Sequence, residues 1–188
     1  MKTAIYLLLS VVVCQSCSVL NDHRVEVALP KEYEACCGVQ PVEFTLRKGF
    51  VFIPNVFTPN GDGINDYFIP TFDNELDIQG YVIKDATGDT LLFQRPAFIP
   101  DRYKELAWNG YRMDGTRYRG LFKYKIAVVS RDGHLRIIEG QACSVICEPG
   151  TAELKTKKGC FYPSQAGMQE KAGKVDSTLS NLEKDCLK

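Results

Sequence analysis

One run of this sequence carries more structural information than any other: Ile53-Pro-Asn-Val-Phe-Thr-Pro-Asn-Gly-Asp-Gly-Ile-Asn-Asp-Tyr-Phe68. Its two prolines fix φ, and its two glycines permit the positive φ that tight bends require. Side-chain oxygens at Asn60, Asp62, Asn65 and Asp66 can fold back on the backbone or hold a hard cation. Bulky apolar residues flank the run, so we expect a shaped loop clamped into a hydrophobic core at both ends.

Short apolar runs with period two surround this loop and predict β-strands. Tyr81 and Ile83 alternate with Val82, and a longer alternation runs from Phe122 to Val128. Glycine turns at 87–89 and 132–133 separate the runs, and Gly140 is expected to form a bulge. The pattern predicts an all-β antiparallel sandwich of about seven or eight strands. The expected strands are residues 25–29, 41–46, 50–53, 76–84, 90–94, 120–130, 134–138 and 142–147.

The only tryptophan, Trp108, precedes Asn109-Gly110. A large aromatic ring next to a turn dipeptide in a sandwich sequence is typical of a core position. We therefore expect Trp108 to be buried and Asn109-Gly110 to form the turn. A ligand-stacking role for the ring is the alternative.

Charge and motif content argue against several classes of function. Lysine plus arginine and aspartate plus glutamate number 23 each among the 188 residues, so the chain has no net field to attract nucleic acid. His23 and His134 are the only histidines, and neither lies near a nucleophile motif. The sequence therefore predicts a protein that is not an enzyme and has no small-molecule substrate.

The N-terminus has the pattern of an export signal. Lys2 precedes an apolar run that is too short to span a bilayer, and Ser16 supplies a small residue before Cys17. This arrangement resembles the lipobox of bacterial lipoproteins, although Cys14 replaces the usual Leu or Val. We expect residues 1–16 to be removed and Cys17 to be acylated, which would anchor the chain in the outer membrane. The sequence does not distinguish the periplasmic face of that membrane from the cell surface. An ordinary signal peptide with Cys17 as a free or paired thiol is the alternative.

Six further cysteines form a candidate disulfide framework: Cys36, Cys37, Cys143, Cys147, Cys160 and Cys186. Cys143 and Cys147 share one expected strand and lie too far apart along it to bond to each other. Adjacent Cys36 and Cys37 are also poor mutual partners. We expect one or both of them to bond to 143 or 147, which leaves Cys160 for Cys186.

Composition changes along the chain and suggests four segments. Residues 1–16 are the signal peptide, and 17–48 form a tether with N-terminal strands. Residues 49–147 form the sandwich domain. Charged and small residues dominate 148–188, which predicts a flexible or weakly helical extension.

Two roles remain open for the polar side chains of the central loop. Asp62 and Asp66, together with Asn60, Asn65 and backbone carbonyls, offer the oxygen ligands of a structural calcium site. The spacing does not follow an EF-hand, because Ile64 takes the place of a ligand and no glutamate closes the loop. In the alternative role, the same side chains cap the amides of the loop and hold it rigid without a metal.

The run Pro54-Asn-Val-Phe-Thr-Pro-Asn-Gly-Asp-Gly-Ile-Asn-Asp66 closely resembles the signature of the gliding-motility-associated C-terminal domain family. Trp108-Asn109-Gly110 replaces the family's Trp-Asp-Gly, and Gly120-Leu-Phe-Lys-Tyr124 replaces its Gly-Thr-Tyr-x-Tyr. The resemblance covers about residues 49–147 and implies an Ig-like sandwich that serves type IX secretion in Bacteroidetes. One departure is the run 83–88, which lacks the exposed Arg and Trp of the family's hairpin.

The resemblance implies recognition or attachment at the cell envelope. We expect a lipoprotein that uses a sorting-type module to bind envelope proteins, including type IX secretion or gliding components. One alternative is a cargo protein that the same module sorts to the cell surface. Another is a glycan-binding sandwich, although the sequence shows no cluster of exposed aromatic residues.

Overall fold

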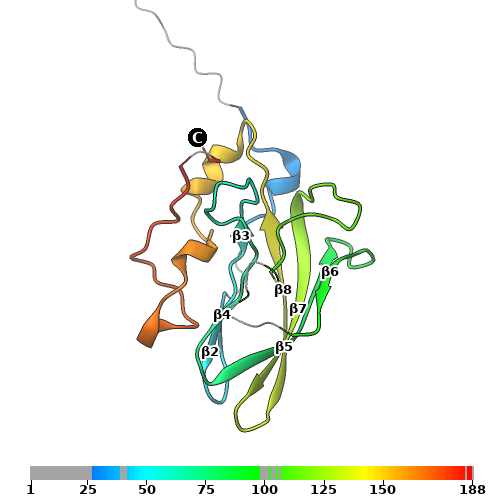
Figure 1. Ribbon diagram of the computed structural model, residues 1–188. Coiled ribbons are helices and arrows are strands. Elements are labelled where there is room, and N and C mark those ends of the chain that lie inside the picture. Colours follow the sequence, from blue (N-terminus) through cyan, green and yellow to red (C-terminus); the bar gives the residue numbers. More distant parts are fainter. Residues whose placement is uncertain are drawn as a thin grey trace, which may run out of the picture.

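The computed structural model describes residues 27–38, 42–97, 102, 105, 107–184, 186 and 187, and it is mostly β (Figure 1). Two sheets enclose a hydrophobic core, an arrangement consistent with a β-sandwich. The first sheet has the order β1-β2-β4 and comprises β1 (Glu43–Thr45), β2 (Phe50–Phe52) and β4 (Thr71–Phe72). The second has the order β3-β8-β7-β5-β6 and comprises β3 (Val56–Phe57), β5 (Leu76–Asp85), β6 (Leu91–Arg95), β7 (Gly120–Ser130) and β8 (Leu135–Ser144).

The alternation predicted for the long strands is confirmed. Tyr81 and Ile83 of β5 are buried, whereas Val82 between them is half-buried on the opposite face. On β7, alternate residues from Phe122 to Val128 are buried in the same core. Because side chains point to opposite faces along a strand, Lys84, Lys123 and Lys125 lie on the outer face of the five-stranded sheet.

The five-stranded sheet is mixed, so the expectation of a purely antiparallel sandwich is wrong. β3 pairs in parallel with β8, with Val56 opposite Cys143 and Phe57 opposite Ser144. β2 ends at Phe52 and β3 begins at Val56. The chain therefore passes from one sheet to the other without reversing, and β3 keeps the direction that makes it parallel to β8.

A second hydrophobic core lies beside β3 and the end of β8. β3 separates the two cores, because Phe57 belongs to the sandwich core and Val56 to the second core. The second core is built from the N-terminal segment, β3, the end of β8 and the C-terminal extension. Its buried members are Tyr33, Cys36, Cys37, Val56, Cys143, Val145, Leu154, Tyr162, Cys186 and Leu187.

The extension packs against the sheets, whereas the sequence predicted a flexible or weakly helical segment. In Figure 1 its orange and red part runs along the side of the molecule next to β3. Leu154, Tyr162 and Leu187 are buried in the second core, which fixes the segment at several points. Its regular elements are the short 3-10 helices η3 (Thr151–Lys155), η4 (Pro163–Gln165) and η5 (Gln169–Lys171), and the corresponding N-terminal element is η1 (Lys31–Tyr33).

Three disulfides join the segments that build the second core: Cys36–Cys143, Cys37–Cys160 and Cys147–Cys186. The expected bond from the adjacent pair to Cys143 is confirmed, and the expected Cys160–Cys186 bond is wrong. The Asn55 side chain accepts from Phe161 N and donates to Gly159 O, which holds Cys160 beside the N-terminal segment and Cys37. Three disulfides indicate an oxidising, extracytoplasmic compartment.

Two expected turn features differ in detail. Gly140 forms no bulge, because it pairs in register with Tyr124, whose ring occupies the space next to it. The β7–β8 turn has three residues, 131–133, because Ser130 N bonds to His134 O and Gly133 adopts a positive φ of 84°. Of the expected strand 25–29, residues 27–29 lie outside any strand, and 25 and 26 lie outside the described residues. The signal peptide 1–16 and Cys17 also lie outside the described residues.

Substitution of Gly140 by alanine is expected to lower the free energy of unfolding by about 1–3 kcal/mol through overpacking. A Cβ atom at this position would lie 2.3 Å from the Tyr124 hydroxyl oxygen and 2.6 Å from the adjoining ring carbon. Urea unfolding measures the change. Gly80→Ala is the matched control, because a Cβ there would lie 3.4 Å from the Ala127 Cβ atom, an ordinary contact. Equal effects of the two substitutions would contradict the packing of Tyr124 on Gly140.

Candidate functional site

The signature loop, residues 58–66, is held by its own side chains. The Asp66 carboxylate accepts from Gly61 N at 2.6 Å and from Gly63 N at 2.7 Å. The Asp62 carboxylate accepts from Ile64 N and from the Asn60 side-chain amide, both at 2.8 Å. Asn60 Oδ1 in turn accepts from Asp62 N at 3.0 Å. These bonds close the bend through capping of backbone amides, the second of the two roles predicted for this loop.

The donor set of the loop does not fit a calcium ion. Calcium takes about six to eight oxygen ligands, and each carboxylate oxygen of Asp62 and Asp66 already accepts a hydrogen bond from the loop. Within the described ranges, no three or more His, Cys, Asp or Glu side chains gather in a way that could hold a metal ion. We therefore assign no chemistry to calcium at this loop.

Millimolar calcium is accordingly expected to leave the melting temperature of the protein unchanged. Binding to the folded state alone would raise the melting temperature with ligand concentration. Differential scanning calorimetry with calcium and with EGTA measures this directly. A rise in calcium that EGTA reverses would show that the loop rearranges to bind the ion.

Asn65 turns away from the other loop side chains and joins the loop to the C-terminal extension. Its backbone has a positive φ of 51°, a conformation that asparagine tolerates better than most residues. The side-chain amide donates to Asn181 O at 2.8 Å and to Glu183 Oε1 at 2.6 Å, and Oδ1 accepts from Ser164 N. Of the four polar residues predicted from the sequence, Asn65 is thus the one that connects distant parts of the chain.

Glu183 is a buried acid that sequence reasoning missed. Its Oε1 accepts from the Thr58 hydroxyl at 2.5 Å and from Asn65 Nδ2, while Oε2 has no hydrogen-bond partner. The residue is 2% exposed. No sequence motif distinguishes Glu183 from the other polar residues of the extension. Its role arises only because the extension folds back onto the signature loop, more than a hundred residues earlier in the chain.

Burial raises the pKa of the Glu183 carboxyl group, and the charges of Asp62 and Asp66 act in the same direction against the hydrogen bonds from Asn65 and Thr58. A group whose pKa is raised by folding stabilises the folded state while it is protonated. This contribution is complete below the unfolded pKa and is lost as the pH rises through the raised folded pKa. Above the unfolded pKa, the raised pKa of Glu183 therefore lowers the stability of the protein.

Glu183→Gln is expected to be more stable than the wild type near neutral pH by about 1–3 kcal/mol, because it removes an unsatisfied buried charge. The amide oxygen can still accept from Thr58 and Asn65. The difference should shrink as the pH falls below about 4 and should vanish near about pH 3, where the wild-type carboxyl group is protonated in both states. Urea unfolding of both proteins across this range measures the difference. A difference that is independent of pH would contradict the raised pKa.

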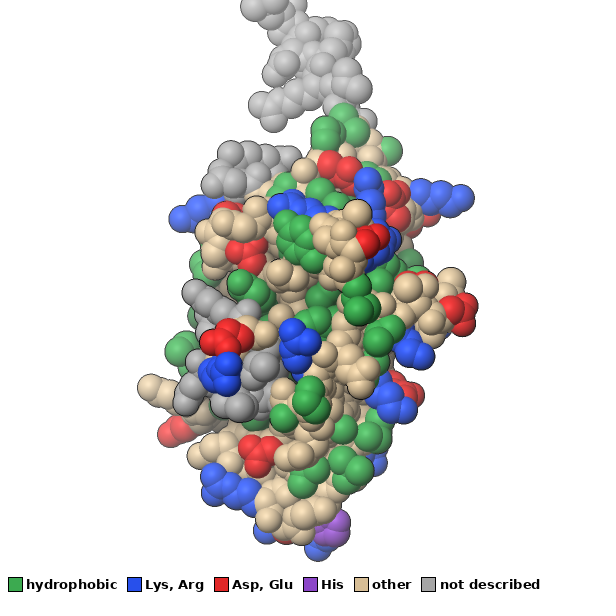
Figure 2. Space-filling view, turned by 45° about the vertical axis from the view of Figure 1, so that its right-hand side comes forward, with side chains coloured by type: hydrophobic (Ala, Val, Ile, Leu, Met, Phe, Trp, Pro, Cys, Tyr) green, Lys and Arg blue, Asp and Glu red, His purple; other side chains and the backbone are tan. Residues whose placement is uncertain are grey.

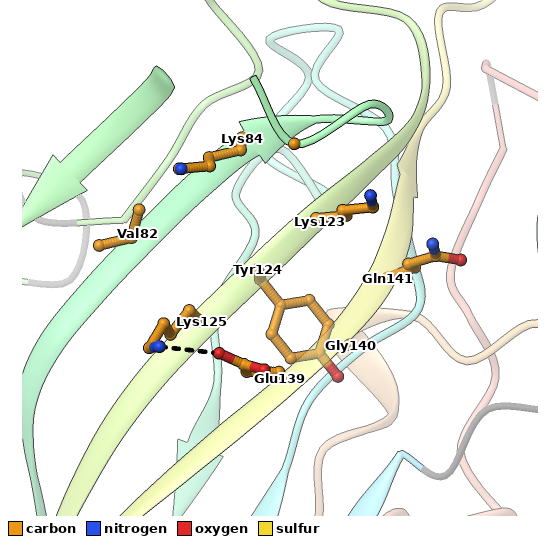
Figure 3. A pocket seen from close by; sticks show the side chains of 9 residues that line it. Val82, Lys84, Lys123, Tyr124, Lys125, Glu139, Gly140 and Gln141 are labelled. Carbon is orange, nitrogen blue, oxygen red and sulfur yellow. Dashed lines mark ion pairs between the residues drawn. The ribbon is translucent and has the colours of Figure 1, made fainter. Parts of the chain in front are cut away.

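A hollow of about 650 Å³ lies on the outer face of the five-stranded sheet (Figure 3). Lys84 and Lys123 stand directly opposite each other on β5 and β7, and Lys125 lies next to them. The Lys123 ammonium donates to Thr87 O at 2.9 Å, and Lys125 pairs with Glu139 on β8 at 2.8 Å. Like charges placed opposite each other on neighbouring strands repel, whereas the Glu139 carboxylate offsets the charge of Lys125.

A groove of about 590 Å³ lies at the β6 edge of the same sheet, between β6 and the loop 109–113. β6 contributes Leu91, Phe93 and Arg95, and the loop contributes Tyr111 and Met113. Hydrophobic, acidic and basic side chains are interspersed over the face shown in Figure 2, with no field of a single sign. The surface is therefore suited to mixed apolar and polar contacts with a protein more than to a polyanion.

Trp108 is buried, as predicted, and comes directly before the groove residues Asn109 and Tyr111 in the chain. Its ring packs against Phe57 and Phe122, and its indole N–H donates to Tyr111 O at 2.8 Å. Gly110, with a positive φ of 79°, allows Pro59 of the signature loop to pack against the turn. The signature loop thus supports the groove wall from behind.

His134 does not form a catalytic site with its neighbours. Arg47 donates to His134 Nε2 at 2.8 Å, and Asp132 lies 3.9 Å from the same nitrogen. The Ser130 hydroxyl donates to the Asp132 carboxylate and lies near the His134 carbonyl oxygen, away from the ring. A serine nucleophile requires a base that accepts its proton, and the imidazole does not occupy that position.

The chain matches no protein-family model, and no curated protein is significantly similar to it. No helix in the described part of the chain has the length and apolar character needed to cross a membrane. The geometry of the described residues is therefore the main basis for a functional proposal, together with the motif in the signature loop.

Proposed function

We propose that the protein is a non-enzymatic lipoprotein of the cell envelope whose Ig-like sandwich acts as a docking module. The module would bind envelope proteins and serve as an accessory of type IX secretion or gliding motility. One observation carries the proposal: a loop that resembles the signature of a secretion-associated family is fixed by its own hydrogen bonds on a disulfide-bonded sandwich.

The contacts of the loop support a structural role for the signature. Its carboxylates cap its own amides, and Asn65 and Thr58 bind Glu183 of the extension. A loop whose polar groups bond to one another can support neighbouring surfaces, and it has few polar groups left to bind a ligand or to take part in catalysis. The exposed features next to it are a groove and a sheet face, which are the usual means of protein recognition.

The three disulfides support the proposed compartment. They close loops with sequence separations of 107, 123 and 39 residues and connect both ends of the described chain to the sheets. Such bonds form and persist after export from the cytoplasm. The predicted lipid anchor at Cys17 would then keep the module at the outer membrane.

The proposal is tested with the full chain and a Cys17→Ala variant in the native cells. The wild type should fractionate with membranes and, after cleavable crosslinking of intact cells, should carry a discrete envelope protein. The variant should be exported but released from the membrane. Recovery of the wild type in the cytosol with reduced thiols would refute the proposal, as would a membrane-bound protein with no crosslinked partner.

A further inference from the structure

β6 is an open edge of the five-stranded sheet. It pairs with β5 on one side, and no other described strand lies on its second side. Its sequence is Leu91-Leu-Phe-Gln-Arg95; Arg95 is its one charged residue, Pro96 follows it, and its pairing with β5 shifts register once. One row of main-chain groups on this strand has no partner strand among the described residues and can pair with another extended chain.

Apolar side chains line the groove beside this edge. Leu91 and Tyr111 are exposed by more than a third of their surface, and Met113 is 85% exposed. Phe93 is half-buried at the base of the groove, where its ring packs edge-on against Tyr81 of the sandwich core. Exposed large apolar groups that converge on one groove mark a site for apolar side chains of a partner.

Two arginines on the groove wall give the site its charge. The Arg95 guanidinium lies 4.7 Å from the centre of the Phe93 ring, and that of Arg112 lies 4.9 Å from the centre of the Tyr118 ring. Neither forms an ion pair with a carboxylate of the described chain; the nearby Asp114 carboxylate accepts from Thr116 instead. Arg95 Nη1 donates to Gln94 O, and Arg112 Nη1 donates to Thr116 Oγ1 and Arg117 O. The remaining N–H groups of both guanidinium groups can donate to a carboxylate of a partner.

We propose that this β6 groove binds an extended acidic segment of an envelope protein, which adds to the sheet as a further strand next to β6. Phe93 and Arg95 share one face of β6, where acidic residues of the segment would meet Arg95 and Arg112. The apolar residues that alternate with them would contact Leu91 and Met113. The inference rests on the proposed function for its compartment, and it adds the surface and the chemistry of the partner.

The lysine hollow is the competing surface, and it fits such a segment less well. It lies on the face of the sheet, so a bound chain would gain no main-chain pairing there. Lys125 is already neutralised by Glu139, and Lys123 is held by Thr87 O. The lysines therefore provide a control surface that is basic, like the groove with its two arginines, but has no strand edge.

The test uses the purified, oxidised protein and a fluorescein-labelled peptide of four Asp-Val repeats. Fluorescence anisotropy should show saturable binding, and a peptide of four Lys-Val repeats should bind at least about tenfold more weakly because its charges repel the arginines. Hydrogen exchange should show added protection of β6 amides in the presence of the Asp-Val peptide.

Variants locate the site. Met113→Asp should weaken binding of the Asp-Val peptide about fivefold or more, and Arg95→Glu should reverse the preference toward the Lys-Val peptide. The double variant Lys123→Gln, Lys125→Gln should leave binding within about twofold, because both lysines lie on β7 and β5 separates them from β6. Circular dichroism and melting temperature establish that each variant is folded.

Several results would overturn the inference: equal binding of the two peptides, binding that depends on Lys123 and Lys125, or concentration-dependent dimers that use the β6 edge for a second copy of the chain. Each of these leaves the fractionation and crosslinking test of the proposed function intact. A partner captured in cells without any binding at β6 would show that the module docks through another surface.

Discussion

Replacement of both Cys36 and Cys143 by alanine is expected to lower the free energy of unfolding by about 3–5 kcal/mol, because it removes a fully buried disulfide. Both cysteines are buried in the second core, and the loss of their bond detaches η1 from β8 in the folded chain. In the unfolded chain, Cys37–Cys160 still joins the neighbouring residues, so the freed loop is the short one that ends at 143 and 160. Chemical denaturation of the oxidised double variant measures the change.

The comparison is the double variant Cys147→Ala, Cys186→Ala, whose bond closes a loop with a sequence separation of 39 residues. Because the entropy of loop closure grows only with the logarithm of loop length, this variant should lose about 4 kcal/mol, an amount similar to the first. A first variant that is as stable as the wild type would contradict the assigned pairing. So would peptide mapping that finds Cys160 bonded to Cys186.

Trp108→Ala is expected to lower the free energy of unfolding by about 3–5 kcal/mol, as for other fully buried aromatic residues. The indole ring is completely buried and contacts Phe57, Tyr118 and Phe122. Its removal would leave a cavity between the two sheets and remove the bond from the indole nitrogen to Tyr111 O. Urea unfolding followed by far-ultraviolet circular dichroism measures the loss.

Met113→Ala is the control for Trp108→Ala, because Met113 is exposed on the same connection and should change stability by less than about 0.5 kcal/mol. The Trp108 variant should also weaken peptide binding in the β6 groove, since Trp108 holds Tyr111 in place. A fully stable Trp108→Ala protein would contradict the assigned core. Unchanged binding in a destabilised variant would show that the groove wall does not depend on the indole.

The sandwich was largely predictable from the sequence, because alternation reports burial directly. Tyr81 and Ile83 face the core as their spacing required, and Trp108 is buried. The flanks of the signature loop are also buried where apolar residues predicted it, at Val56 and Phe57 on one side and Phe68 on the other. Local pattern was sufficient here since each strand buries one face.

The rest depends on contacts between distant parts of the chain. The parallel pairing of β3 follows from how the chain passes between sheets, which hydropathy does not encode. The disulfide pairing depends on where the extension folds back, and six cysteines permit about fifteen pairings. Glu183 has no motif, and its role is visible only when it meets Thr58 and Asn65.

The signature loop illustrates both limits. Sequence reasoning left its four polar residues between calcium binding and amide capping. The geometry favours capping by Asp62 and Asp66 and gives Asn65 a different role, as a link to the extension. Asn60 and Asn65 are the same residue type, yet Asn60 bonds within the loop and Asn65 bonds to the extension. The backbone conformation decides which role each one takes, and composition does not reveal it.

The central claim is that this protein acts by docking to another protein of the envelope, and photocrosslinking in intact cells tests it most directly. A photoreactive residue would be placed one position at a time at Gln94 and Met113 in the β6 groove and at Lys84 and Gln141 on the sheet face. We predict that the two groove positions capture the same envelope protein and that the face positions capture it weakly. Absence of a protein adduct at every position, in cells where the chain is folded and membrane-bound, would contradict the claim.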